Sequence, residues 1–241
     1  MSGETEVIYV KIVLIGESGV GKTCIISRFV NDMFDSNSLS TSGASYAAKT
    51  LRFEEKKASI QMQLWDTAGQ EKFKSIARMF YKDATVAVLV YDITRKDSYN
   101  GLVNYWYKEL CDNGPDDIIL AIAANKSDLY TQEQVPEIEV REFAQKIGAI
   151  FRNTSARTSD GIDDLFESIG KKILDPNYKE DAVDSNGTQP DTKTTGNPGI
   201  NNQRKALKLD QDNNGGKKKK KCCGFKITKM LLLFIRLLIL E

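Results

Sequence analysis

An α/β fold with a six-stranded, mostly parallel sheet and helices on both faces is predicted by the alternation of strand-like and helix-like segments along the 241-residue chain. Strands are expected near residues 8–15, 47–54, 58–65, 85–91, 118–124 and 149–154. Helices are expected near residues 22–31, 71–81, 98–111, 136–147 and 161–173. In such sheets ligands bind at the carboxyl ends of the strands, where Gly16, Asp66 and Asn125 are predicted to lie.

The first strand runs directly into the glycine-rich segment Gly16-Glu17-Ser18-Gly19-Val20-Gly21-Lys22-Thr23, which precedes a helix. Glycines allow a tight turn whose N–H groups point inward and bind phosphate together with the helix N-terminus. Lys22 can reach the terminal phosphates, and the Thr23 hydroxyl can bind Mg²⁺. The alternative is an ordinary glycine-rich turn. The residues predicted to contact a nucleotide here are Gly16, Ser18, Gly19, Val20, Gly21, Lys22, Thr23 and Cys24.

Asn125-Lys126-Ser127-Asp128 follows the apolar run 118–124 and indicates which base is bound. The Asp128 carboxylate can accept hydrogen bonds from N1–H and the N2 amine of guanine, whereas adenine has no such pair of donors. Lys126 is expected to pack along the base, and Asn125 to connect this segment to the phosphate loop. The alternative is a chance match in a polar turn. The motif therefore favours GTP and GDP over adenine nucleotides.

Trp65-Asp66-Thr67-Ala68-Gly69-Gln70 ends the third predicted strand. Asp66 is expected to hold Mg²⁺ through a water molecule, and Gly69 to place its N–H against a γ-phosphate. Gln70 can orient the attacking water, which makes it the candidate catalytic residue. A strand-terminating turn would explain the glycine, but it would not explain the coincidence with the two other motifs.

With these motifs the chain resembles the Rab family of small GTPases over about residues 9–174, and again at the cysteines near its end. Further Rab-like features are Phe80-Tyr81, Asp92-Ile93-Thr94 and Thr154-Ser155-Ala156. The segment 43–46 is most similar to the endosomal branch of the family. The resemblance implies a P-loop GTPase domain over residues 1–175.

The resemblance also implies roles for individual residues. Thr41 would join Thr23 and Asp66 at the Mg²⁺ site and sense the γ-phosphate, within a first switch at 34–46; the second switch would be 68–81. Ser155, Ala156 and Arg157 would line the base, with Arg157 in place of the usual lysine. Tyr46, Trp65 and Phe80 would form an aromatic surface that effectors read in the GTP state, although core packing is the alternative.

The function implied is a switch in vesicle and endosomal membrane traffic that hydrolyses GTP slowly, because neither Arg28 nor Arg78 matches an arginine finger. Expected partners are exchange factors, GTPase-activating proteins, effectors and a GDP-dissociation inhibitor or escort protein, with no nucleic acid. The chain is expected to be monomeric and to cycle between the cytosol and the cytoplasmic face of endomembranes. The alternative function is a GTP-binding membrane scaffold with negligible turnover.

Residues 176–216 are predicted to be a flexible linker, because they are rich in Asn, Asp, Thr, Gly and Lys and poor in apolar residues. Residues 217–241 are predicted to target a membrane. Lys217–Lys221 can bind anionic lipid, and in Rabs a cysteine pair such as Cys222-Cys223 carries two geranylgeranyl chains. The alternative for the lysine run is a solubilising or nuclear-localising patch.

The cysteines are followed by eighteen residues, and Met230 to Leu240 is almost wholly apolar. This segment is too short to cross a hydrocarbon core, which needs about 20 helical residues. Three interpretations remain open: a reading frame extended beyond the true end of the chain, an interfacial helix beside palmitoylated cysteines, or a short tail anchor.

Overall fold

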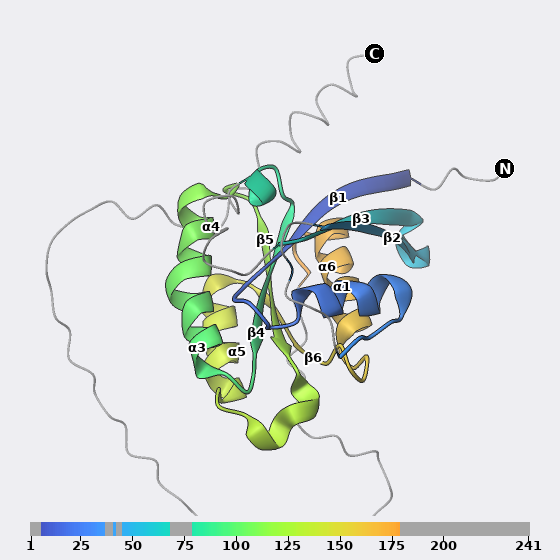
Figure 1. Ribbon diagram of the computed structural model, residues 1–241. Helices are drawn as coiled ribbons and strands as arrows, with labels where there is room; N and C mark the ends of the chain where they lie inside the picture. The colour runs from blue at the N-terminus through green and yellow to red at the C-terminus, as the bar shows by residue number, and fades with distance from the viewer. Residues whose placement is uncertain (1–5, 37–40, 42–44, 68–78, 179–241) are drawn as a thin grey trace, which may run out of the picture. The chain divides into compact units, whose positions relative to one another are not determined.

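The computed structural model describes residues 6–36, 41, 45–67 and 79–178, and within these ranges six strands form one sheet (Figure 1). Their order is β2-β3-β1-β4-β5-β6, and every neighbouring pair is parallel except the antiparallel hairpin of β2 and β3. The predicted α/β fold with a mostly parallel sheet is confirmed. The strands are β1 (Glu6–Ile15), β2 (Ser45–Phe53), β3 (Ala58–Asp66), β4 (Val86–Asp92), β5 (Ile119–Asn125) and β6 (Ile150–Thr154).

The helices of the described residues also agree with the expected ranges, apart from one interruption. The predicted helix 98–111 is in fact a longer helical stretch that contains a π-helical segment, η3, between α3 and α4. Most of the helix expected at 71–81 lies outside the described residues. The elements are α1 (Lys22–Asn31), α3 (Lys96–Gly101), η3 (Leu102–Trp106), α4 (Tyr107–Asn113), α5 (Glu137–Ile147), α6 (Ile162–Leu174) and the 3₁₀ turns η1 (Glu54–Lys56) and η4 (Ser127–Gln132).

The sheet separates two hydrophobic clusters, because successive side chains of a strand point to opposite faces. On β1, Val13 belongs to the cluster covered by α3, α4 and α5, whereas Leu14 belongs to the cluster covered by α1 and α6 (Figure 1). Trp106 anchors the first cluster, and Phe29 stacks on Phe166 in the second with ring centroids 3.8 Å apart. Helices therefore cover both faces, as expected for buried parallel strands.

The carboxyl ends of the central strands meet at one edge of the sheet, which sets where a ligand can bind. Leu14 of β1 pairs with Asp66 of β3, and Asp92 of β4 pairs with Asn125 of β5. Directly after β1 the chain passes so close to β4 that a side chain at Gly16 would lie 2.2 Å from the Val90 carbonyl oxygen. Only glycine fits this approach, so the turn after β1 lies directly against the neighbouring strand.

None of the helices in the described ranges has the length and apolar character needed to span a membrane. The linker prediction falls almost entirely outside the described residues, and the polybasic segment, Cys222, Cys223 and the apolar end lie wholly outside them.

Candidate nucleotide-binding site

A cavity of about 400 Å³ lies at the edge where the strands end. Most of the residues predicted to bind a nucleotide line it, although they come from distant parts of the sequence. Gly16, Val20 and Ser155 do not line the cavity, and Phe34, Asp35, Ser36 and Leu129 line it without having been singled out as nucleotide contacts. The predicted residues found there are Ser18, Gly19, Gly21, Lys22, Thr23, Cys24, Thr41, Asn125, Lys126, Asp128, Ala156 and Arg157.

The phosphate loop adopts a conformation that glycine makes possible. Gly19 and Gly21 have φ values of 75° and 95°, in the left-handed region. A side chain at Gly21 would also lie 2.4 Å from Nδ2 of Asn125. Helix α1 begins directly afterwards without a side-chain cap, so its first N–H groups remain available to an anion in the cavity.

Lys22 is buried at the base of the loop and lacks a full counter-charge. Its Nζ donates hydrogen bonds to the carbonyl oxygens of Gly16 and Glu17, each at 2.9 Å. Burial lowers the pKa of Lys22 from 10.5 to about 8, partly offset by the charges of Asp66 and Glu17. An anionic group in the cavity would therefore stabilise the ammonium that burial disfavours.

Three oxygen-bearing side chains converge beside Lys22. The Thr23 hydroxyl donates to Oδ2 of Asp66 at 2.6 Å, and the hydroxyl oxygens of Thr23 and Thr41 are 2.7 Å apart. Oδ1 of Asp66 is buried and has no hydrogen-bond partner within the part of the chain that the structure describes, and burial raises the pKa of this carboxyl. No group of three His, Cys, Asp or Glu residues among the described ones forms a metal site. A carboxylate with an unsatisfied oxygen and two hydroxyls nevertheless suits Mg²⁺, which takes few protein ligands.

At the other end of the cavity, neighbouring loops hold the Asp128 carboxylate in place. The Ser155 hydroxyl donates to Oδ1 of Asp128 at 2.7 Å and accepts a bond from the Thr158 N–H at 3.1 Å. Asn125 donates from Nδ2 to the Val20 carbonyl at 2.7 Å, which joins this segment to the phosphate loop as predicted. Ser155 therefore acts on the base site through Asp128 rather than by lining the cavity.

Arg28 is a site residue that the sequence did not indicate. Its Nε donates to the Ala156 carbonyl at 2.9 Å, and its Nη2 donates to the Arg157 carbonyl at 3.3 Å. Its side chain is only 15% exposed and also pairs with Asp32. Arg28 therefore fixes the loop that carries Ala156 and Arg157, and this role depends on α1 lying beside the loop that follows β6.

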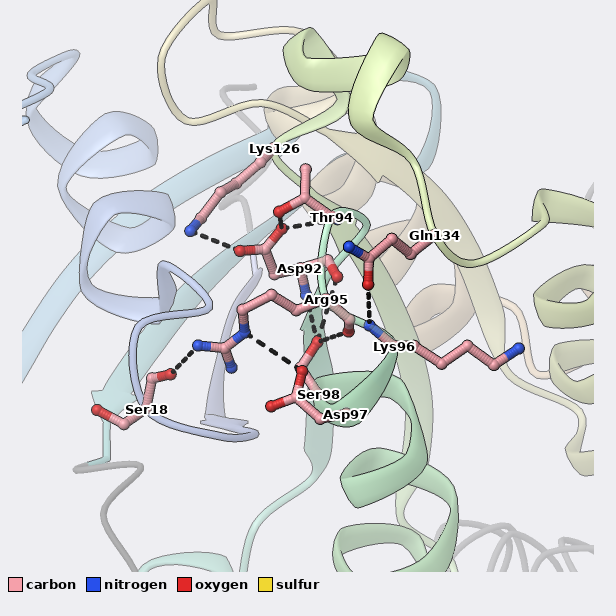
Figure 2. Close-up of polar contacts among 9 residues, drawn as sticks. All are labelled: Ser18, Asp92, Thr94, Arg95, Lys96, Asp97, Ser98, Lys126 and Gln134. Atoms are coloured by element: carbon pink, nitrogen blue, oxygen red, sulfur yellow. Dashed lines mark hydrogen bonds and ion pairs between the residues drawn. The ribbon is translucent and has the colours of Figure 1, made fainter.

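Lys126 lies on the cavity wall with its ammonium bound to Asp92 (Figure 2). The Nζ–Oδ2 distance is 2.6 Å, and the Asp92 side chain is almost fully buried. Oδ1 of Asp92 also accepts hydrogen bonds from the N–H and the hydroxyl of Thr94. Burial alone would raise the pKa of Asp92, but the bonds from Lys126 and Thr94 hold it below 3.8. In the sequence, Asp92-Ile93-Thr94 stood out only as a Rab-like feature, and no contact between Asp92 and Lys126 was predicted.

The three predicted effector residues lie together on β2, β3 and the helical turn at 79–81. The rings of Tyr46 and Trp65 meet edge-on, with their centroids 5.5 Å apart. The ring centroids of Trp65 and Phe80 are 6.2 Å apart. Tyr46 is 53% exposed, whereas Trp65 and Phe80 also pack against the core. The predicted residues Gly69 and Gln70 lie outside the described residues.

The Asp92–Lys126 pair predicts how stability depends on pH. Because the pKa of Asp92 is lower in the folded chain than in the unfolded chain, its stabilisation is complete above 3.8 and is lost as the pH falls through the folded value. Asp92→Asn should therefore lower the free energy of unfolding by about 2 kcal/mol at neutral pH, and the difference from wild type should shrink below pH ~4. Urea unfolding at a series of pH values measures this.

Asp97→Asn is the control for this experiment, because Asp97 lies nearby in the first turn of α3 but is 77% exposed. It should change the free energy of unfolding little at any pH. An Asp92→Asn deficit that stays constant from pH 6 to pH 3 would contradict the assignment of this ion pair.

Comparison with known proteins agrees with this geometry. Residues 11–175 match the Ras family. The chain is 45% identical over 168 residues to Ras-related protein Rab-31 of Rattus norvegicus, covering 69% of this chain and 85% of that protein. It is 42% identical over 163 residues to human Ras-related protein Rab-22A (68% and 82% covered), and 37% identical over 173 residues to Ras-related protein Rab-5A of Dictyostelium discoideum (72% and 85%). The chain therefore belongs to the Ras family and, within it, to the Rab small GTPases, which hydrolyse GTP and act as switches in membrane traffic.

Proposed function

We propose that the 400 Å³ cavity binds GTP or GDP together with Mg²⁺, and that replacement of one nucleotide by the other switches the protein between two states. The observation that carries this proposal is that one cavity is lined by Lys22, by the Thr23–Thr41 hydroxyl pair, of which Thr23 donates to the buried Asp66, and by Asp128, which Ser155 holds in place. The first two suit a metal-bound polyphosphate, and the third suits guanine.

At the phosphate end, Lys22 and the uncapped N-terminus of α1 bind the phosphates, and Thr23, Thr41 and Asp66 hold Mg²⁺. The bound ion neutralises phosphate charge. Thr41 is the member of this cluster that belongs to the first switch, so its hydroxyl connects the metal site to a segment that can respond to the γ-phosphate. Loss of that phosphate would weaken the hold on Thr41.

At the base end, Asp128 accepts the two guanine N–H groups, and Ser155 keeps its carboxylate turned for this purpose. Lys126 and Asn125 complete the wall, and Arg157 stands where the family usually has lysine. The long stem of Arg157 can still cover the base, because arginine packs its apolar stem against neighbouring groups.

Hydrolysis depends on Gln70, which orients the attacking water, and on Gly69, which donates its N–H to the γ-phosphate. Without an arginine finger the intrinsic rate is on the order of 10⁻⁴ s⁻¹, and an activating protein raises it by about 10⁵-fold. The alternative of a scaffold with negligible turnover is not favoured, because relatives of this kind are GTP hydrolases.

Guanine specificity is tested by Asp128→Ala. The variant should lose two charge-assisted hydrogen bonds and bind GDP about 100-fold more weakly or worse, while ATP stays a poor ligand. Titration with fluorescent GDP measures the affinity. Asp117→Ala, which removes an exposed carboxylate at the opposite end of β5, should bind as wild type does. Unchanged GDP affinity in Asp128→Ala would refute the proposed base site.

Metal binding and catalysis are separated by two further variants. Asp66→Ala should weaken the Mg²⁺ dependence of nucleotide binding, so that chelation with EDTA no longer speeds GDP release as it does in wild type.

Gln70→Leu should keep that dependence but lose both intrinsic and activator-stimulated hydrolysis in single-turnover assays. If Gln70→Leu responded fully to an activating protein, Gln70 would not be the residue that orients the water.

Exchange factors, activating proteins and effectors act on Rab GTPases generally. We infer that Tyr46, Trp65 and Phe80 form the effector surface, and that a GDP-dissociation inhibitor or escort protein binds the lipidated chain.

The proposed domains are a GTPase domain at 1–175, a linker at 176–216 and a membrane-targeting segment at 217–241. Association with endomembranes is general for these relatives; an endosomal location and lipidation of Cys222 and Cys223 are our proposals.

Lipidation is tested by the intact mass of the protein purified from its own cells. Two isoprenoid increments on a chain that ends at or near Cys223 would support the double prenylation that we propose. A chain that reaches Glu241 without isoprenoids would contradict it. Cys222→Ser with Cys223→Ser should remove the increments and release the protein from the endosomal membrane fraction.

A further inference from the structure

Arg95 reaches from the connection between β4 and α3 onto the phosphate loop (Figure 2). Its Nη1 donates to the Ser18 carbonyl oxygen at 3.3 Å. A side chain added at Gly19 would begin 3.7 Å from the same nitrogen. The guanidinium therefore lies against the backbone of two consecutive loop residues, the first of which, Ser18, is 77 positions away in the sequence.

The turn that carries Arg95 is held by hydrogen bonds on both sides. The Arg95 N–H donates to the Asp92 carbonyl at 3.0 Å, and the Ser98 hydroxyl donates to the Arg95 carbonyl at 2.7 Å. The next N–H, of Lys96, donates to Oε1 of Gln134 (Figure 2). Because this backbone is fixed, placing the guanidinium on the phosphate loop costs only the rotamer freedom of the Arg95 side chain.

The charge of Arg95 is only partly neutralised. Among the described residues its buried Nε has no hydrogen-bond partner, and it lies 3.7 Å from Oδ1 of Asp97, a side chain that is 77% exposed. The positive charge of Arg95 is also one of the causes that lower the pKa of Lys22. The field of the guanidinium therefore extends to the phosphate-binding lysine.

We propose that Arg95 is a positioning residue of the nucleotide site, which holds the Ser18–Gly19 backbone in place and adds a second fixed cation beside Lys22, so that bound nucleotide is released more slowly. The inference rests on the proposed function, because it requires a nucleotide phosphate in the loop. The effect is larger for the triphosphate than for the diphosphate, since the triphosphate carries more negative charge.

The test measures release of fluorescent GDP and of a fluorescent, non-hydrolysable GTP analogue from the full chain in Mg²⁺. Arg95→Gln removes the charge but keeps an amide donor, and should speed release of the GTP analogue about fourfold and of GDP about twofold, as for a partly exposed charge. Arg95→Lys should restore most of the wild-type rate, because it restores the charge.

Lys96→Gln is the matched control. It removes the same charge one residue further along, but Lys96 pairs with Glu139 on α5, away from the loop. Its release rates should equal those of wild type. Asp97→Asn provides a second measurement with the opposite sign: it leaves Arg95 in place, removes the carboxylate that partly neutralises it, and should slow release of the GTP analogue by about 1.5-fold.

Wild-type release rates in Arg95→Gln would overturn the inference. Equal acceleration for both nucleotides without rescue by lysine would overturn it too, because that result is expected of a purely structural brace. If Arg95→Gln does not fold, as judged by thermal unfolding, faster or unchanged release from Asp97→Asn overturns it instead. These results differ from failure of the proposed function, in which the wild-type chain would not retain guanine nucleotide or Asp128→Ala would bind it normally.

Discussion

The hydrogen bond from Asn125 to the Val20 carbonyl is the contact on which the arrangement of the site depends, because it joins the base-binding and phosphate-binding segments across the sheet. The two segments approach so closely that a side chain at Gly21 would collide with the Asn125 amide. Thr154 adds a weaker bond to the same amide, at 3.3 Å. The Asn125 side chain therefore helps to set the distance between the base end and the phosphate end of the cavity.

Around this contact the site holds charged groups in surroundings that disfavour their charges. Burial pushes the pKa of Lys22 down and that of Asp66 up, and one oxygen of Asp66 has no hydrogen-bond partner. In a protein core such groups would be replaced or paired. Here they are supported by neighbouring hydrogen bonds, and the natural compensation for both is an anion that arrives with a divalent cation. The unfavourable burial of these two groups supports the proposal that the cavity binds metal-bound phosphates.

Asp92 connects the nucleotide-binding cavity to the rest of the fold. One of its oxygens pairs with Lys126 of the base segment, and the other holds the turn from which Arg95 extends to the phosphate loop. A single buried carboxylate therefore supports both ends of the cavity. Arg28 also supports the cavity, because its hydrogen bond to the Ala156 carbonyl joins α1 to the loop after β6. Both are held in place by partners that lie far away in the sequence.

The α/β class, the strand positions to within a few residues, and the residue types proposed to select phosphate, Mg²⁺ and guanine could all be predicted from the sequence alone, because these depend on local periodicity and on short motifs of fixed spacing. The sequence did not reveal the π-helical segment η3 or the roles of Arg28, Asp92 and Arg95. Those features depend on which strands become neighbours: Asp92 lies opposite Asn125 only because β4 pairs with β5 in one register. Long-range register follows from the packing of the whole core, so the folded arrangement of the strands was needed to tell which charged residues lie at the site.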